Sequence, residues 1–447
     1  MPESPAEGSL KAPQRHPLEW KEEAFYDKDL LLKEMERVFD ICHGCRRCFS
    51  LCNAFPTLFD AIDEAPTGEL DSVDKRVYWK VVDHCYLCDL CFMTKCPYVP
   101  PHPFNVDFPH LMLRGKAVKF KEGQVKARDR LITNTDAVGR LAGIPVVVKA
   151  VNASEKARPV RRLMDKVLGI HPKAWLPPYH ADTLHRRFKK RPRKALEPRA
   201  GERTRGKAVL FGTCYGEYNE PDIAMDLVRV FEHNGIPVEL AESRCCGMPK
   251  LEIGDLESVE RLKDFNIPRL ARWVEEGFDL VAPVPSCALM FKQALPLIFP
   301  GDEAVEKVSR AMFDPFEYLM LRDQEGLLNT DFKVPLGKVV HHAACHMRVQ
   351  NIGLKSRELL SKVPGTTIQV VERCSGHDGT YAMKSEFHDV AMKIGRPVFN
   401  QVRQAQPDYY TSDCPIAGHQ IETGLGDGSR PTHPLTLLRI AYGLEEP

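Results

Sequence analysis

The chain has 447 residues, with 62 Lys and Arg against 61 Asp and Glu, and 43% of its residues are hydrophobic. This composition excludes collagen-like, coiled-coil and largely disordered chains. The N-terminus has no basic and apolar leader, and the densest apolar stretch, 144–148, is far too short to span a membrane. We therefore expect a cytoplasmic protein whose 15 cysteines stay reduced and serve as metal or redox sites.

Two cysteine-rich runs follow a stretch, 30–39, that has the apolar spacing of a helix. The runs span 42–52 and 85–96, and each has three cysteines at C-x2-C-x2-C spacing and a fourth cysteine further on. This spacing points three thiolates into one small loop, which surrounds one corner of a [4Fe–4S] cluster. In two-cluster ferredoxins the fourth cysteine ligates the other cluster.

The spacing therefore predicts two [4Fe–4S] clusters with interleaved ligands, in a mostly helical ferredoxin module. Structural zinc would use two C-x2-C pairs and leaves the third cysteine of each run unexplained. Asn53 replaces the usual proline, and four residues instead of three precede the last cysteine, but neither departure changes the ligand count. The first ligand set is Cys42, Cys45, Cys48 and Cys96, and the second is Cys85, Cys88, Cys91 and Cys52.

The middle of the chain is strongly basic. Residues 110–207 have 26 basic and 8 acidic side chains, a net +18, whereas the segments before and after carry −7 and −10. Either this is a solvated, partly disordered linker, or it docks on an anionic membrane or an acidic partner. No nucleic-acid-binding motif accompanies the charge, so no nucleic acid is expected. A surface helix here would suit a membrane interface, with Leu163, Met164, Val167 and Leu168 opposite Arg140, Lys149, Arg161, Arg162 and Lys166.

The last 240 residues contain an internal repeat. Three cysteines recur at offsets of 131, 129 and 127 residues, which indicates a duplication with small deletions. Each copy alternates short apolar runs with helical patterns (222–233 and 256–276 in the first), which predicts a parallel sheet. Every repeated cysteine follows a strand, and ligands of such sheets bind beyond the carboxyl ends of the strands. The predicted strands are 208–212, 236–240, 279–284, 338–342, 367–371 and 408–411.

The sequence predicts a metal site in each copy, but the two sites are unequal. The first copy offers Cys214, Cys245, Cys246 and Cys287, which suit an iron–sulfur cluster or zinc. The second offers Cys345, Cys374 and Cys414, with Ser375 in place of Cys246. His377 could complete a Cys3His site there. Alternatively, the second copy is inactive and its cysteines only pack, or it holds a labile cluster.

We therefore expect an α+β multidomain protein, in which an α-helical ferredoxin domain precedes two duplicated α/β, Rossmann-like Cys-Cys-Gly units. The predicted divisions are an N-terminal extension (1–40), the N-terminal module (41–110), a basic connecting region (111–206), unit one (207–330) and a degenerate unit two (331–447).

This order of motifs resembles the family of the iron–sulfur C subunit of anaerobic glycerol-3-phosphate dehydrogenase. It is similar in architecture to the D subunit of heterodisulfide reductase and to the iron–sulfur subunit of glycolate oxidase. The segments that carry the likeness are 214–219, 244–249, 345–347 and 433–438. The family usually has Cys-Cys-Gly in both units and a closing C-x2-C, whereas this chain has Cys374-Ser375-Gly376 and no closing C-x2-C.

The resemblance implies an electron-transfer subunit that takes electrons from a partner flavoprotein toward quinone or another acceptor. A membrane or quinone contact through the basic region would make it peripheral on the inner face of the cytoplasmic membrane. No G-x-G-x-x-G fingerprint or P-loop is present, so we do not expect a flavin or nicotinamide site in this chain. Two alternatives remain: a thiol-disulfide or heterodisulfide reductase acting at unit one, and a non-enzymatic protein with structural metals.

Overall fold

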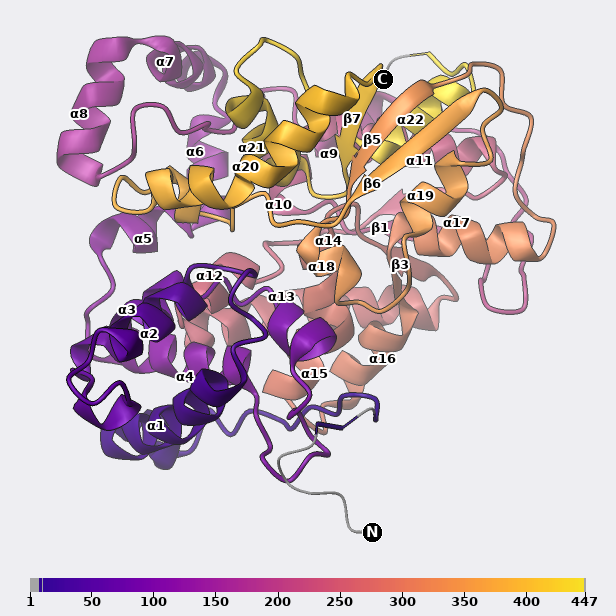
Figure 1. Cartoon of the computed structure of the whole chain (residues 1–447). Coiled ribbons are helices and arrows are strands. Elements are labelled where there is room, and N and C mark those ends of the chain that lie inside the picture. Colours follow the sequence, from indigo (N-terminus) through magenta and orange to yellow (C-terminus); the bar gives the residue numbers. More distant parts are fainter. Residues whose placement is uncertain (1–7, 10, 446–447) are drawn as a thin grey trace.

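Two small parallel sheets, one in each unit, organise the C-terminal half of the chain (Figure 1). The computed structural model describes residues 8–9 and 11–445. In unit one the strand order is β2-β1-β3-β4, and in unit two it is β6-β5-β7. All pairs are parallel, as the sequence predicted. The strands are β1 (Ala208–Leu210), β2 (Val238–Leu240), β3 (Asp279–Val281), β4 (Met312–Phe313), β5 (Gly337–His342), β6 (Thr366–Val371) and β7 (Tyr409–Ser412).

Helices cover these sheets and include both predicted helices of unit one. Asp255 caps the longest of them, because its side chain accepts a hydrogen bond from the Ser258 amide. The helices of unit one are α10 (Cys214–Tyr218), α11 (Pro221–His233), α12 (Met248–Glu252), α13 (Leu256–Glu275), α14 (Pro285–Leu289), α15 (Leu295–Ile298), α16 (Glu303–Ala311) and α17 (Pro315–Gln324). Those of unit two are α18 (Cys345–Arg348), α19 (Lys355–Leu360), α20 (His388–Ala405), α21 (Pro415–Leu425) and α22 (Pro434–Ala441).

Units one and two share a hydrophobic core. Helix α22 of unit two contacts α11 of unit one, and Leu438 lies in the same buried cluster as Phe231. A buried ion pair joins the same two helices, since Arg439 Nε lies 2.8 Å from Asp226 Oδ1. The duplicated units are therefore packed into one body, which fixes their cysteine sites relative to each other.

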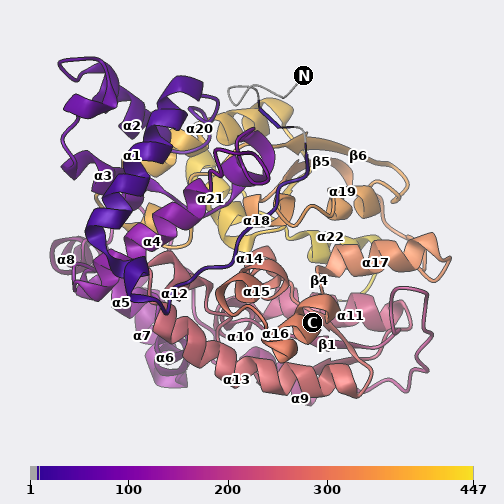
Figure 2. The ribbon, with the colours of Figure 1, turned by 90° about the horizontal axis from the view of Figure 1, so that it is seen from below.

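The N-terminal module is helical, as expected (Figure 2). Its helices bury apolar side chains at helical spacing, such as Leu31, Met35 and Phe39 on one face of α1. Helix α4 crosses the predicted boundary at residue 110. The helices are α1 (Lys28–Cys45), α2 (Ala54–Asp63), α3 (Arg76–His84), the short π-helix η3 (Cys91–Lys95) and α4 (Phe108–Lys121).

The described residues before α1 run across unit one, a contact that the sequence did not predict. The Leu18 amide donates to the Leu297 carbonyl at 2.8 Å, and Trp20 Nε1 donates to the Ile298 carbonyl at 2.9 Å. The segment thereby ties unit one to the N-terminal module, because Arg15 pairs with Asp89 at 2.7 Å in the second cysteine run.

The basic connecting region is not simply an extended linker, since it forms five helices. Of these, α7 and α8 stand at the edge of the molecule in Figure 1. The expected surface position of Arg161 is wrong: Arg161 is buried and donates to the carbonyls of His171, Pro172 and Ala174. These bonds satisfy the turn after α8. The five helices are α5 (Ala127–Ile132), α6 (Thr135–Ala142), α7 (Pro145–Lys156), α8 (Arg158–Leu168) and α9 (Leu184–Lys190). In the described part of the chain, no helix has the length and apolar character that a membrane span needs.

Candidate metal centre

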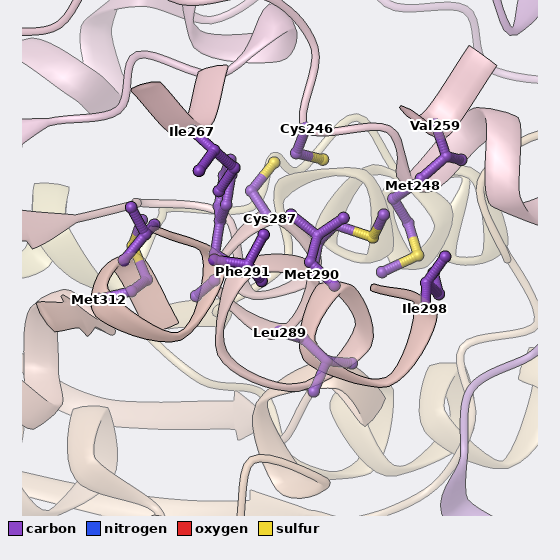
Figure 3. Packing of buried hydrophobic residues seen from close by; sticks show 14 of the residues in the cluster. Cys246, Met248, Val259, Ile267, Cys287, Leu289, Met290, Phe291, Ile298 and Met312 are labelled. Atoms are coloured by element: carbon purple, nitrogen blue, oxygen red, sulfur yellow. The ribbon is translucent and has the colours of Figure 1, made fainter. Parts of the chain in front are cut away.

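The structure brings the four cysteines of unit one together beyond the carboxyl ends of three strands. Cys214 begins α10 after β1, Cys245 and Cys246 follow β2, and Cys287 lies in α14 after β3. The Sγ atoms of Cys214 and Cys245 are 3.9 Å apart. The convergence that the sequence predicted is therefore present. Figure 3 shows Cys246 and Cys287 in the packed interior beside Met290 and Phe291.

In unit one each cysteine sulfur contacts the next: Cys214 contacts Cys245, Cys245 contacts Cys246, and Cys246 contacts Cys287. Contact with Cys245, then burial, raises the pKa of the Cys214 thiol, and contacts with Cys245 and Cys287, then burial, raise the pKa of Cys246. Contacts with Cys214 and Cys246 lower the pKa of Cys245, in contrast to the thiols on either side of it. Four adjacent sulfurs in a buried site need a cation to carry several thiolates at once.

The connecting region covers the unit-one site. Asp136 Oδ2, at the start of α6, accepts a hydrogen bond from the Cys245 amide at 2.9 Å. Burial raises the pKa of Asp136 to about 6. Thr213 has a φ of 57°, and its hydroxyl accepts from the Gly216 amide at 2.8 Å, which holds the strained turn that presents Cys214. The sequence analysis missed Asp136, since only the fold brings it near the cysteines.

In unit two, Cys345, Cys374 and Cys414 also follow the three strands. Burial, then Cys374 and Cys414, raises the pKa of Cys345, so the three thiols face one another. The Gly376 amide donates to Cys374 Sγ at 3.3 Å, while Ser375 is buried where unit one has Cys246.

His377, the expected fourth ligand of unit two, lies among other histidines. Burial, then His346, His342 and His419, lowers its pKa to about 3, so it is a neutral imidazole with ligating capacity. Burial raises the pKa of Cys374 to about 11, and the nearby Asp378 carboxylate adds to this shift. Position 378 is a residue that the sequence analysis did not consider.

The eight cysteines of the N-terminal module lie in two neighbouring groups. Burial, then Cys48, Cys96 and Cys45, raises the pKa of Cys42. In the other group, burial, then Cys85, raises the pKa of Cys52. Burial is the largest cause of the raised pKa of Cys91. The next cause is Cys48 of the first group, ahead of the other cysteines of the second group, so the two groups adjoin each other.

The second of these groups adjoins unit two. Tyr86 and Tyr381 have ring centroids 4.7 Å apart, and Cys52, Cys88 and Cys374 all pack against this aromatic cluster. Tyr381 is anchored to the N-terminal module because its hydroxyl lies 2.7 Å from His84 Nδ1. An aromatic contact thus joins two cysteine sites that lie almost 290 residues apart in sequence.

Units two and one also adjoin each other. Burial, then Asp413 and Cys287, raises the pKa of Cys414 to about 11, although backbone hydrogen bonds oppose this shift. Cys345 and Cys88 both pack against the unit-one core that contains Cys245, Cys246 and Cys287. The cysteine groups therefore follow one another through the interior: the first N-terminal group, the second group, unit two and unit one.

The spacing of the sulfurs differs between the sets as a whole and one pair in unit one. Four thiolates on one tetrahedral zinc, each at about 2.3 Å, lie roughly 4 Å apart, whereas a four-iron cluster holds each thiolate on a different iron and spreads them further apart. Among the described side chains, no three cysteine sulfurs lie within 4.8 Å of one another, so the sets are wider than a zinc site and suit iron–sulfur clusters. The 3.9 Å between Cys214 and Cys245 Sγ also suits zinc.

Comparison with known proteins identifies the repeated domain. Residues 208–292 and 339–422 each match the family described as "Cysteine-rich domain". The two matched segments coincide with the duplicated units, and the chain is also similar to subunits of a dehydrogenase and of a reductase.

Three relatives give the likeness more detail. The C subunit of anaerobic glycerol-3-phosphate dehydrogenase from Escherichia coli (strain K12) is 27% identical over 346 residues, 76% of this chain and 83% of that protein. The B subunit of fumarate reductase (CoM/CoB) from Methanothermobacter marburgensis is 26% identical over 254 residues, 54% of this chain and 48% of that protein. Lactate utilization protein A 2 of Bacillus cereus (strain Q1) is 28% identical over 186 residues, 40% of this chain and 74% of that protein. The resemblance inferred from the motifs is confirmed.

Proposed function

We propose that the chain is the iron–sulfur electron-transfer subunit of a respiratory-type dehydrogenase complex. The observation that carries this proposal is the succession of four adjoining, buried or half-buried cysteine groups. Iron–sulfur clusters held by these cysteine groups would accept and pass single electrons. Burial, then neighbouring thiols, raises the pKa of Cys42 and of Cys88, so a bound cluster would be needed to hold these two as thiolates.

The proposed ligands are those of the two interleaved sets. Cys42, Cys45, Cys48 and Cys96 would hold one [4Fe–4S] cluster, and Cys52, Cys85, Cys88 and Cys91 the other, in a ferredoxin domain spanning 41–110. Units one (207–330) and two (331–447) would hold an additional iron–sulfur cluster or zinc. In unit two, His377 would complete the cysteine ligands.

The proposed partner is a flavoprotein dehydrogenase, with quinone or another acceptor at the far end. The support is that the relatives are named as subunits of a dehydrogenase and of a reductase. The basic connecting region (111–206) would hold the chain at the inner face of the cytoplasmic membrane.

Serine variants test the interleaving directly. If Cys96 shares a cluster with Cys45, then Cys96→Ser and Cys45→Ser lose the same EPR signal of the reduced protein. Cys52→Ser should instead match Cys88→Ser and lose the other signal. Anaerobic EPR and iron counts check this. Loss of the Cys88-type signal in Cys96→Ser would overturn the ligand assignment.

A second candidate is a thiol-disulfide or heterodisulfide reductase acting at unit one. The 3.9 Å contact between Cys214 and Cys245 favours it, because two thiols this close can exchange with a substrate disulfide. Turnover of a small disulfide by the chemically reduced protein tests it, with Cys245→Ser as the control. If no disulfide is reduced, this candidate is removed.

A further inference from the structure

The connecting region exposes most of the large apolar side chains that the described surface presents. Seven of the ten exposed ones lie between residues 131 and 167. Val146 is 82% exposed, Val167 70% and Leu141 66%. An isolated exposed apolar residue needs no explanation, but a cluster on a few short helices marks a contact surface. The seven residues are Leu131, Leu141, Ile144, Val146, Val147, Leu163 and Val167.

Basic side chains lie beside these apolar ones. On α8, Leu163 and Val167 are four residues apart and share one side of the helix, and Arg162 and Lys166 form the adjacent row. From Arg140 to Leu168 the sequence has seven basic and two acidic residues. Among the side chains that the structure describes, no carboxylate pairs with Lys149, Arg162 or Lys166.

Helix α6 connects this surface to the cysteines of unit one. Its first turn supplies Asp136, which accepts from the Cys245 amide, and its far end carries exposed Leu141. The helix is held closely against α10, since a Cβ on Gly139 would lie 2.3 Å from the Tyr218 ring. Eight residues of helix span about 12 Å, so the exposed surface lies roughly one short helix away from the unit-one site.

We propose that α6–α8 dock on an anionic lipid bilayer, with the exposed Leu and Val side chains entering the headgroup boundary and the basic rows on lipid phosphates. This combination of apolar area and positive charge is what an interfacial helix requires. The inference rests on the proposed membrane contact and deepens it: unit one is the cysteine site that faces the bilayer. Of the cysteine sites, unit one would therefore lie nearest to an electron acceptor dissolved in the lipid.

Vesicle flotation with the cluster-loaded protein tests the docking. We expect binding to phosphatidylcholine vesicles with about 30% phosphatidylglycerol, much weaker binding to phosphatidylcholine alone, and weakening by about 0.5 M salt. Val146→Asp with Val167→Asp should lower the partition coefficient about tenfold or more. Val334→Asp, an exposed valine outside the connecting region, is the matched control and should bind as wild type does.

Two matched pairs of charge-removing substitutions distinguish the docking helices from the rest of the basic region. Arg162→Gln with Lys166→Gln should lower binding about tenfold, whereas Lys189→Gln with Lys194→Gln removes the same charge near α9 and should lower it less than about threefold. Equal loss in both pairs, salt-insensitive binding or no binding overturns the proposal. Loss of a protein partner, with vesicle binding unchanged in the valine variants, would make this a protein interface instead. Iron content and EPR should be unchanged in every variant, so the failure of the docking is distinguishable from failure of the electron-transfer function.

Discussion

Units one and two have the same strand order around their central strand, but different parts of the chain cover their cysteines. Asp136 of the connecting region covers unit one, whereas Tyr86 and the Leu87 carbonyl of the N-terminal module adjoin unit two. Unit one keeps four cysteines, and unit two has Ser375 in place of the fourth. The comparison indicates that duplication supplied two similar sites, and that different neighbouring segments then came to cover them.

The largest expected effect comes from exchanging the residue that distinguishes the units. Cys246→Ser should remove the metal centre of unit one, because loss of a ligand from a four-thiolate site weakens metal binding by at least about a hundredfold. Ser375→Cys should instead strengthen metal binding in unit two. Iron, zinc and acid-labile sulfide per chain measure both effects, and Ser412→Cys is a control for an added buried thiol. Unchanged metal content in Cys246→Ser would contradict the difference between the units.

His419 is the next contact to test, because it joins the units directly. It lies between Glu220 of unit one and Glu422 of unit two. Burial opposes its charge, but hydrogen bonds to both carboxylates raise its pKa to about 9. A raised pKa stabilises the fold below the unfolded value of about 6.5, and this stabilisation is lost as the pH rises through about 9.

His419→Gln should therefore destabilise the protein on the order of 2–3 kcal/mol near pH 6 and hardly at all above pH 10. Thermal unfolding midpoints of both proteins across this range measure the difference. His16→Gln, an exposed histidine of the N-terminal segment, is the control. A constant difference between wild type and His419→Gln at all pH values would refute the charged contact.

Gly139→Ala tests how the connecting region covers unit one. The added methyl group would lie 2.3 Å from the Tyr218 ring, so α6 must move away from α10. We expect a loss of about 1–3 kcal/mol and a lower melting temperature. Ala150→Ser, at an exposed position of α7, should change the melting temperature by less than about 1 °C. If Gly139→Ala were as stable as the wild-type protein, the close contact between α6 and α10 would not be what holds the connecting region over unit one.

The smallest expected effect concerns the contact between unit two and the N-terminal module. Tyr381→Phe removes the hydroxyl that lies 2.7 Å from His84 Nδ1, at a cost of about 1 kcal/mol. The ring stack with Phe387, at 4.5 Å, is kept. The unfolding midpoint measures this cost. In a redox titration followed by EPR, the reduction potential of the second cluster should shift while that of the first stays unchanged. Equal shifts in both clusters would contradict a local contact.

The strands, the parallel pairing and the position of each repeated cysteine after a strand were predictable from the sequence. Apolar runs such as 208–212, each followed within a few residues by a cysteine, contain that information locally. The two-residue strand β4 was not predictable, because two residues carry no periodicity. The covering residues were missed for a different reason: Asp136 lies 109 residues from Cys245 and nothing local links them.

Arg161 shows the limit of helical patterns for side-chain placement. Its position among charged residues predicts exposure, but its guanidinium turns inward to three carbonyls at the end of α8. The neighbouring Leu163 and Val167 then face outward, where a core position would ordinarily be expected. The hydrogen bonds of Arg161 to the segment that follows α8 hold this face of the helix inward.

Metal content of the wild-type protein, purified without oxygen, tests the central claim most directly. The account predicts about eight irons and eight acid-labile sulfides from the N-terminal module, with two interacting EPR signals on reduction, and further metal from unit one. A chain that binds zinc at the N-terminal cysteines, with no iron and no EPR signal, would contradict it.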